Sequence, residues 1–219
     1  HTLGSCLAVQ ADAYCKVRGF PRRAGGEDFY LLNKLAKLGP VIRGAGQCIE
    51  LESRPSHRVP FGTGPAVARI GASEAPGELP LFYHPACFEA LRELLAALPA
   101  LAQNESLELG SLLADNKLPA QLRTAVLRCL EQMGLASALA HCRRQGATPA
   151  QFLRHFHQWF DGFRSLKFIH ALRDSGWPDQ TLQQLRELNP GFWPAAALEQ
   201  NPPDSEPIRR HLGWISPHR

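Results

Sequence analysis

The stretch "RRAGGEDFYLLNKLAKLGP" (residues 22–40) places two adjacent carboxylates, Glu27 and Asp28, between a pair of glycines and a helical pattern. From Glu27 onward, apolar residues recur every three or four positions, as they do along one side of an amphipathic helix. Gly39 and Pro40 then interrupt the pattern. We therefore predict a helix over 27–38 with two apolar lines (Phe29, Leu32 and Ala36; Leu31, Leu35 and Leu38) and a polar side formed by Tyr30, Asn33, Lys34 and Lys37.

The residues on either side of this helix predict a small mixed α/β part. "SCLAV" (5–9) suits a buried strand, residues 11–19 suit a short helix with Gly19 as its stop, and "QCIELE" (47–52) suits a second strand. Six prolines and four glycines fill residues 53–85 and argue against regular structure over most of that stretch. A loop of this length is usually functional or a linker.

From 85 to 188 the pattern is helical throughout, which predicts a fold that is mainly α with a small α/β part. The predicted apolar faces are Phe88, Leu91, Leu95 and Leu98 in one helix, and Leu118, Leu122, Val126, Cys129 and Met133 in another. We expect the longest helix to begin after Thr148, with a capping box to Gln151, and to end near Gly176. Its apolar stripe is Phe152, Phe156, Trp159, Phe163 and Leu166, and a last helix covers about 179–188.

Composition indicates an ordinary soluble globular protein. The chain has 219 residues, of which 44% are hydrophobic and 20% charged, with a net charge of +4. The basic residues are scattered, whereas a nucleic-acid-binding protein usually concentrates them on one face, so we expect no nucleic-acid partner. None of the six cysteines has a C-x-x-C spacing, and several lie in apolar helical patterns, which favours a reduced, cytoplasmic protein without a zinc site. No apolar run approaches the roughly 18–20 residues that span a bilayer.

Glu27 and Asp28 allow two interpretations. Acidic residues in a first helical turn complement the helix dipole, and this would account for them without any function. The same geometry also fits a general base, because a carboxylate at a helix mouth behind two glycines is fixed in place and unobstructed by neighbouring side chains.

The wider pattern resembles the second half of the catalytic domain of family 2 glycosyltransferases, which have the glycosyltransferase A-type (Rossmann-like) fold. The matching elements occur in the family's order over about 40 residues: Gly4, the strand 5–9, the helix 11–17, the turn Gly19-Phe20-Pro21, the loop Gly25-Gly26, and Glu27-Asp28. The resemblance covers residues 1–70. It implies inverting transfer of a sugar from a nucleotide-sugar donor to an acceptor hydroxyl. Asp28 would be the catalytic base, Glu27 would support it or bind acceptor hydroxyls, and Gly4 and Ser5 would line the acceptor site.

The sequence departs from the family pattern in one respect. The family's donor half carries an Asp-x-Asp motif that binds a divalent metal, Mn²⁺ or Mg²⁺, and this sequence contains no Asp-x-Asp. Because the chain also lacks a starting Met, we expect a fragment without its donor-binding half. Such a fragment would be inactive alone, since positioning both substrates supplies much of the rate.

The loop 53–67 provides the remaining candidate residues. The resemblance implies that His57 could ligate the metal and that Arg54 or Arg58 could face the donor phosphates, whereas the alternative is a solvated loop with incidental charges. We expect His155, His157 and His170 to be surface residues, because no two of them have the i, i+4 spacing of a helical ligand pair.

The predicted organisation has four parts: the catalytic half at 1–70, a Pro/Gly-rich linker at 71–84, a helical domain at 85–188 and an extended Pro-rich tail at 189–219. The competing hypothesis is a non-catalytic helical module that binds another protein, since nearly half of the chain is amphipathic helix without recognisable chemistry.

Overall fold

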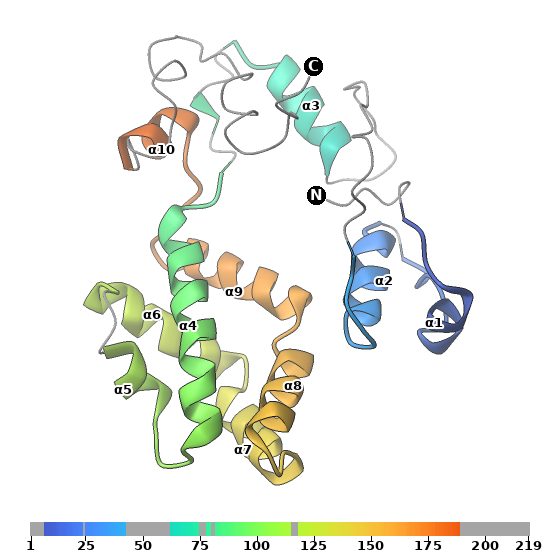
Figure 1. Cartoon of the computed structure of the whole chain (residues 1–219). Helices are drawn as coiled ribbons and strands as arrows, with labels where there is room; N and C mark the ends of the chain where they lie inside the picture. The colour runs from blue at the N-terminus through green and yellow to red at the C-terminus, as the bar shows by residue number, and fades with distance from the viewer. Residues whose placement is uncertain are drawn as a thin grey trace, which may run out of the picture.

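The computed structural model describes residues 7–23, 25–42, 62–74, 78–79, 82–114 and 118–188. In these ranges the chain is mainly helical, as predicted, and the only β pairing is a single bridge between Phe82 and Gln180. The helices, labelled in Figure 1, are α1 (Ala11–Lys16), α2 (Glu27–Leu35), α3 (Thr63–Gly71), α4 (Pro85–Gln103), α5 (Leu109–Ala114), α6 (Ala120–Gln132), α7 (Leu135–Gln145), α8 (Pro149–Trp159), α9 (Gly162–Asp174) and α10 (Leu182–Leu188).

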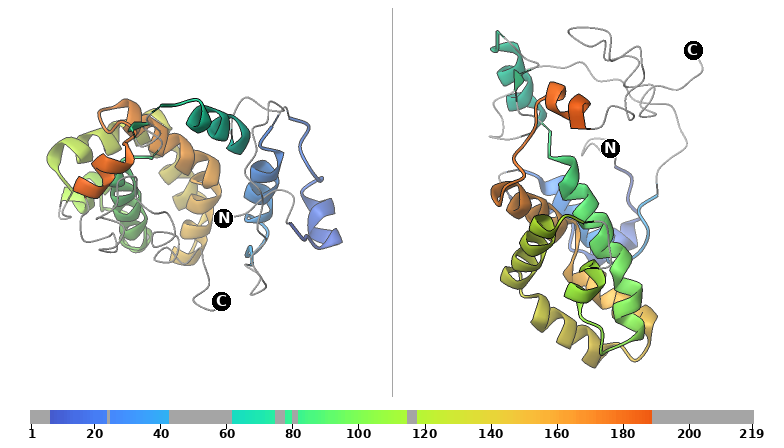
Figure 2. Two further views of the ribbon diagram at one scale, coloured as in Figure 1. Left: turned by 90° about the horizontal axis from the view of Figure 1, so that it is seen from above. Right: turned by 90° about the vertical axis from the view of Figure 1, so that its left-hand side faces the viewer.

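Helix α4 is the central element of a bundle with α5, α6, α8 and α9, all of which contact it. Its start is well specified: Pro85 occupies the first turn, and the His84 ring nitrogen Nδ1 accepts a hydrogen bond from the Ala86 N–H at 3.1 Å. Figures 1 and 2 show α1 and α2 together on the α9 side of this bundle.

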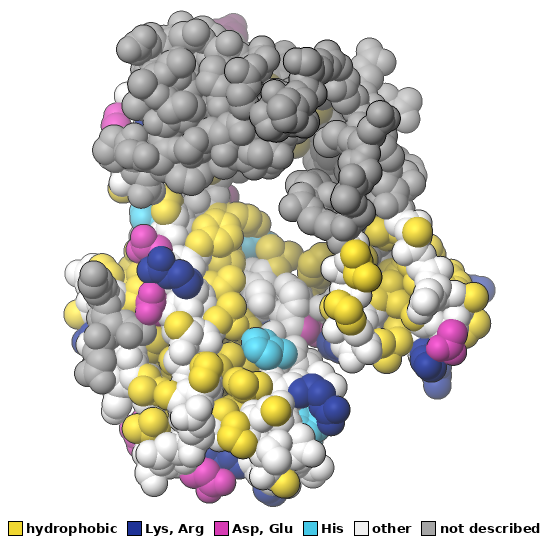
Figure 3. Space-filling view, viewed as in Figure 1, with side chains coloured by type: hydrophobic (Ala, Val, Ile, Leu, Met, Phe, Trp, Pro, Cys, Tyr) yellow, Lys and Arg dark blue, Asp and Glu magenta, His cyan; other side chains and the backbone are white. Residues whose placement is uncertain are grey.

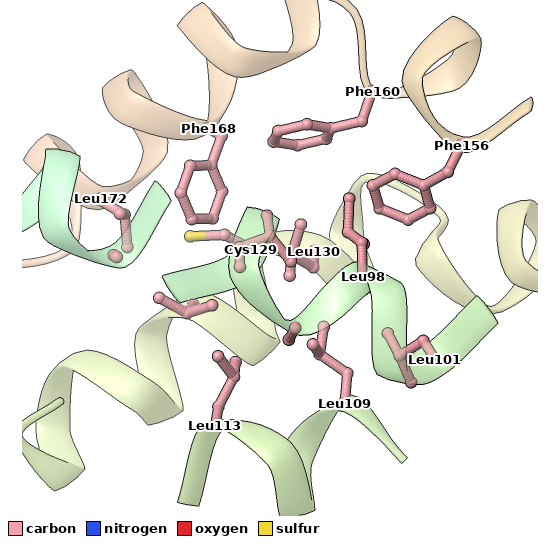
Figure 4. Close-up of a cluster of buried hydrophobic side chains, with 14 of the residues drawn as sticks. Leu98, Leu101, Leu109, Leu113, Cys129, Leu130, Phe156, Phe160, Phe168 and Leu172 are labelled. Atoms are coloured by element: carbon pink, nitrogen blue, oxygen red, sulfur yellow. The ribbon is translucent and has the colours of Figure 1, made fainter. Parts of the chain in front are cut away.

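The hydrophobic core lies between α4 and its neighbours, and Figure 4 shows part of it. Three aromatic side chains from α8, α9 and the turn between them pack in series, with 6.0 Å between the ring centroids of Phe156 and Phe160 and 5.8 Å between those of Phe160 and Phe168, the second pair edge to face. Burying one leucine or phenylalanine side chain completely stabilises the fold by about 1.5–3 kcal/mol relative to leaving it exposed. The other buried members include Leu94, Leu98, Leu101, Leu109, Leu113, Leu122, Val126, Cys129, Leu130 and Leu172.

The predicted apolar face of α4 is confirmed in part, since Leu98 is buried and Leu91 packs against the core. Phe88 and Leu95 are 51% and 38% exposed, whereas Cys87, Ala90 and Leu94 are fully buried. The face that packs begins at Cys87, because its small side chains let the neighbouring helices approach closely and fill space at native density. Figure 3 shows the result, with hydrophobic side chains gathered on the surface over α4.

The single long helix predicted from Thr148 to Gly176 is two helices, α8 and α9. Its start is as predicted, since Thr148 Oγ1 accepts a hydrogen bond from the Gln151 N–H at 3.3 Å. The helix stops at Phe160, and Asp161 begins a new one by accepting a hydrogen bond from the Arg164 N–H at 3.1 Å. An aspartate is a strong N-cap, and this local signal outweighs the continuous apolar period.

The predictions for the N-terminal third are tested only in part. Leu7, Ala8 and Val9 lie in no strand, and the rest of the strand at 5–9, with the whole strand at 47–52, falls outside the described residues. A Rossmann-like α/β part is therefore not shown. The stretch predicted to be irregular contains α3, because Pro65 sits in the first turn, where a proline is tolerated.

Helices α1, α2, α6 and α10 agree with their predictions. Helix α1 is followed by Gly19 at φ 64°, α2 occupies most of 27–38, α6 buries Leu122, Val126 and Cys129, and α10 ends at Leu188. Of the helices described, none has both the length and the apolar character needed to cross a bilayer.

Candidate functional site

The candidate base and its partner, Asp28 and Glu27, lie in the first turn of α2, as predicted. Gly26 precedes them with φ 70°, in the left-handed region that favours glycine, and it provides no side-chain cap. Both carboxylates are half-buried. Asp28 Oδ1 accepts a hydrogen bond from the N–H of the next residue, Phe29, at 2.8 Å, so one of its oxygens is used locally.

Neither carboxylate forms an ion pair within the described part of the chain. The nearby Arg23 instead lies over the ring of Tyr30, with its guanidinium carbon 4.0 Å from the ring centroid. A carboxylate without a fixed cation beside it keeps lone pairs available for an incoming hydroxyl, which a general base requires.

The other predicted site residues cannot be placed beside Asp28. Gly4, Ser5, Arg54, His57 and Arg58 all lie outside the described residues. Among the residues that are described, no three His, Cys, Asp or Glu side chains cluster as metal ligands would. The donor and metal assignments therefore rest on the resemblance alone.

A surface hollow of about 420 Å³ occurs elsewhere, between α6 and the turn after α9. It is lined by Gln121, Thr124, Ala125, Ser175, Gly176 and Trp177. Neither Glu27 nor Asp28 contributes to it, so this hollow is separate from the candidate carboxylates.

The polar side of α2 docks onto the bundle at the α8–α9 junction. Asp161 Oδ2 accepts hydrogen bonds from Asn33 Nδ2 at 3.1 Å and from Lys37 Nζ at 2.5 Å. In return, Asn33 Oδ1 accepts one from the Gly162 N–H at 3.0 Å. We call Asn33, Lys37, Asp161 and Gly162 the α2 clamp.

The α2 clamp is electrostatically favourable. Burial alone would raise the pKa of Asp161, but hydrogen bonds from Lys37, the Arg164 N–H and Asn33 together hold that pKa below its ordinary value. The Asp161 side chain is only 11% exposed, so its pairing with Lys37 is less screened by water than a surface ion pair.

Apolar and backbone contacts extend the docking of α2. The ring centroids of Tyr30 and Phe163 lie 5.6 Å apart, and this contact joins α2 to α9 beside the α2 clamp. On the other side, Lys34 Nζ donates a hydrogen bond to the Val17 carbonyl oxygen at 2.9 Å and ties α2 to the end of α1.

The sequence predicted the polar side of α2 but gave no partner for it. Tyr30, Asn33, Lys34 and Lys37 all make tertiary contacts. Sequence reasoning also missed Asp161, although the run "FDGF" (160–163) carries a usable signal. An Asp followed by a Gly inside a helical pattern indicates an N-cap and hence a helix break.

The three histidines that were predicted to be surface residues are exposed to different degrees. His157 is exposed, as expected of a surface residue. His155 is half-buried, with its ring centroid 5.9 Å from that of His141. His170 is half-buried as well, and its Nε2 lies 2.8 Å from the Tyr83 hydroxyl in a hydrogen bond that links α9 to the start of α4.

Comparison with known proteins adds no further assignment for these residues. No family model, curated protein or solved structure matches the chain.

Proposed function

We propose that this chain contributes the acceptor side and the helical domain of an inverting, nucleotide-sugar-dependent glycosyltransferase, with Asp28 as general base. The proposal rests on the ordered resemblance over residues 1–70 and on the position of Asp28. The observation that carries it is the presentation of Asp28, half-buried in the first turn of α2 and without an ion pair in the described part of the chain.

The proposed reaction is a single displacement. The acceptor oxygen bonds to the anomeric carbon of the donor sugar while the bond from that carbon to the nucleotide's phosphate oxygen breaks. The hydroxyl proton passes to the Asp28 carboxylate, and the nucleoside diphosphate leaves. Glu27 supports Asp28 or binds acceptor hydroxyls, and Gly4 and Ser5 line the acceptor site. Attack opposite to the leaving group inverts the anomeric centre.

The donor side of the site is proposed by resemblance alone. A divalent metal, Mn²⁺ or Mg²⁺, would neutralise the donor diphosphate, with His57 as a candidate ligand and Arg54 or Arg58 facing the phosphates.

The orientation of α2 is compatible with this role. Asn33, which holds α2 on the bundle, follows Asp28 by five positions, and at 100° per residue the two side chains lie about 140° apart around the helix. The docked side of α2 and the side that carries Asp28 therefore differ. Docking leaves Asp28 free to meet a substrate.

The test is an Asp28→Asn substitution in the longest natural protein that contains this chain. Assays with UDP-, GDP- and dTDP-hexoses, each with and without Mn²⁺ or Mg²⁺, would measure nucleoside diphosphate release. Loss of a general base should lower kcat by about 10²–10⁴-fold while the circular dichroism spectrum stays unchanged. Asp12→Asn is the matched control, because Asp12 also sits in a first helical turn but pairs with Lys16 at the surface. Turnover at the wild-type rate by Asp28→Asn would refute the assignment.

One observation favours the second candidate, a non-catalytic helical module that binds another protein. Phe82, Phe88 and Leu95 are each at least 38% exposed and lie on or directly before α4. Large apolar side chains that are exposed near one another are typical of protein interaction surfaces. This candidate predicts no nucleotide-sugar binding in isothermal titration calorimetry, and self-association or capture of a protein partner that Phe88→Ser weakens.

A further inference from the structure

We infer that Asp161 is a positioning residue: through the α2 clamp, the helical domain holds the helix that carries Asp28. The functional half of this inference rests on the function proposed above. Its structural half does not, since it concerns only how α2 is held on the bundle. The helical domain would then be a platform for the same site.

The geometry makes Asp161 a shared partner of two helices. Its Oδ1 accepts from the Arg164 N–H at 3.1 Å and caps α9, while its Oδ2 accepts from Asn33 of α2 and from Lys37, which lies two residues past the end of α2. One carboxylate therefore fixes the start of α9 and the C-terminal half of α2 together. A carboxylate that is 11% exposed and receives several hydrogen bonds has little freedom to reorient.

Asn33 strengthens this arrangement because both ends of its side-chain amide are paired. Its Nδ2 donates to Asp161 and its Oδ1 accepts from the Gly162 N–H, one of the N–H groups in the first turn of α9 that have no partner within the helix. Two antiparallel hydrogen bonds between the same pair of segments restrict rotation of α2 about its own axis. Such a rotation would swing Asp28 away from any fixed substrate.

The distance along α2 is short enough for this restriction to reach the carboxylate. Asp28 and Asn33 are five residues apart, or about 7.5 Å along the helix axis. An intact helix transmits its orientation over so short a distance. Misplacement of a reacting group by about 1 Å can cost on the order of 10²-fold in rate, so loss of the clamp should be visible in catalysis.

Asp161→Asn separates the clamp from the cap. The asparagine Oδ1 can still cap α9, because asparagine is as good an N-cap as aspartate. Its Nδ2, however, cannot accept hydrogen bonds from Asn33 or Lys37. The substitution should therefore leave the bundle folded and loosen the docking of α2, which keeps the Asn33–Gly162 hydrogen bond and the Tyr30–Phe163 contact.

The first measurement is amide hydrogen exchange of the full chain, read by mass spectrometry of peptides from α2 and α4. Losing hydrogen bonds to a charged acceptor should speed exchange in α2 by about tenfold or more and leave α4 unchanged. Lys37→Met should speed exchange in α2 by a smaller factor. The double variant should exchange little faster than Asp161→Asn alone, because both changes remove the same interaction. Asp12→Asn, which alters an exposed ion pair in α1, should change neither helix.

The second measurement is nucleoside diphosphate release by the longest natural protein that contains the chain. Asp161→Asn should lower kcat roughly ten- to hundredfold while the KM for the nucleotide sugar stays within about twofold, since the base and not the donor site is disturbed. Unchanged exchange in α2 would overturn the inference. Faster exchange with unchanged kcat, while Asp28→Asn is inactive, would overturn the positioning role. Full activity of Asp28→Asn would instead remove the proposed function and the positioning role with it, and the exchange data alone would then decide whether Asp161 holds α2.

Discussion

Asn33 Oδ1 accepts a hydrogen bond from the Gly162 N–H at 3.0 Å, although 129 residues separate the two in the sequence. This bond places the end of α2 directly on the start of α9. It leaves little space at position 162, where a Cβ atom would lie 3.3 Å from Asn33 Oδ1 and 3.9 Å from the ring of Phe29. The glycine is therefore part of the docking surface.

Gly162→Ala should destabilise the docking of α2. An alanine in a helix is ordinarily favoured over glycine by about 0.5–1 kcal/mol, but here its methyl group would push Asn33 away. We expect no gain, or a loss of up to about 1 kcal/mol, in the free energy of unfolding measured in urea. Gly110→Ala in α5 is the control, since its new Cβ would meet Leu127 at an ordinary 3.6 Å, and it should stabilise the protein. An equal gain at both positions would contradict the prediction.

The N-cap of α8 should make a measurable contribution to stability. Thr148→Ala removes the hydroxyl that accepts from the Gln151 N–H, and such caps are typically worth about 1 kcal/mol. The loss should appear as a lower midpoint in guanidinium chloride at unchanged slope. Thr124→Ala is the matched control, because that hydroxyl only donates to the Ala120 carbonyl within α6, and it should be neutral or slightly stabilising.

The stability that Asp161 contributes should depend on pH with a defined sign. Since its pKa in the folded protein is below the ordinary value of 3.8, the contribution is fully present above that value and is lost as pH falls through the lower folded pKa. At pH 7 the free energy of unfolding of the wild type should exceed that of Asp161→Asn by about 1–3 kcal/mol. The gap should narrow below about pH 4. Urea unfolding of both proteins from pH 7 to pH 3 would measure it, and a constant gap would be inconsistent with this role.

Cysteine reactivity should divide between exposed and core thiols. Burial, together with Asp179 and Cys129, raises the pKa of Cys87 to about 11, and burial also raises the pKa of Cys129 and Cys142. At pH 8 about one Cys87 thiol in a thousand would be ionised, and the thiolate is the reactive form. Iodoacetamide should therefore label exposed Cys15 in the native protein and the three core cysteines only after unfolding, as read by peptide mass spectrometry. Labelling of Cys87 at the rate of Cys15 in native protein would refute this.

Apolar periodicity predicted the helices well and their partners poorly. Helices α1, α2, α6 and α10 follow from spacing and stop signals, because both are local properties of the chain. The buried face of α4 could not be predicted in this way, since Phe88 and Cys87 both belong to plausible apolar lines. In the structure the smaller residue, Cys87, is buried and Phe88 is exposed. Periodicity treats polar residues as solvent-facing, so it could not foresee that Asn33 and Lys37 meet Asp161.

In the candidate site, too, the local sequence predicted the helix but not the contacts that hold it. The position of Asp28 at a helix mouth followed from the sequence, because a glycine pair before an apolar period marks a helix start. The docking that holds this helix depends on a residue more than 120 positions away, and no local pattern encodes such a pairing. The Asp-Gly pair at 161–162 was the only visible signal, and it concerned the helix break alone.

The order of synthesis gives the α2 clamp a kinetic consequence. Asp161 follows Lys37 by 124 residues. At roughly 5–20 residues per second, α2 leaves the ribosome about 6–25 seconds before its anchor exists. During that interval the Asn33 amide and the Lys37 ammonium can bind only water in place of Asp161. A protein truncated before Asp161 would therefore carry Glu27 and Asp28 on a helix that lacks its docking partner.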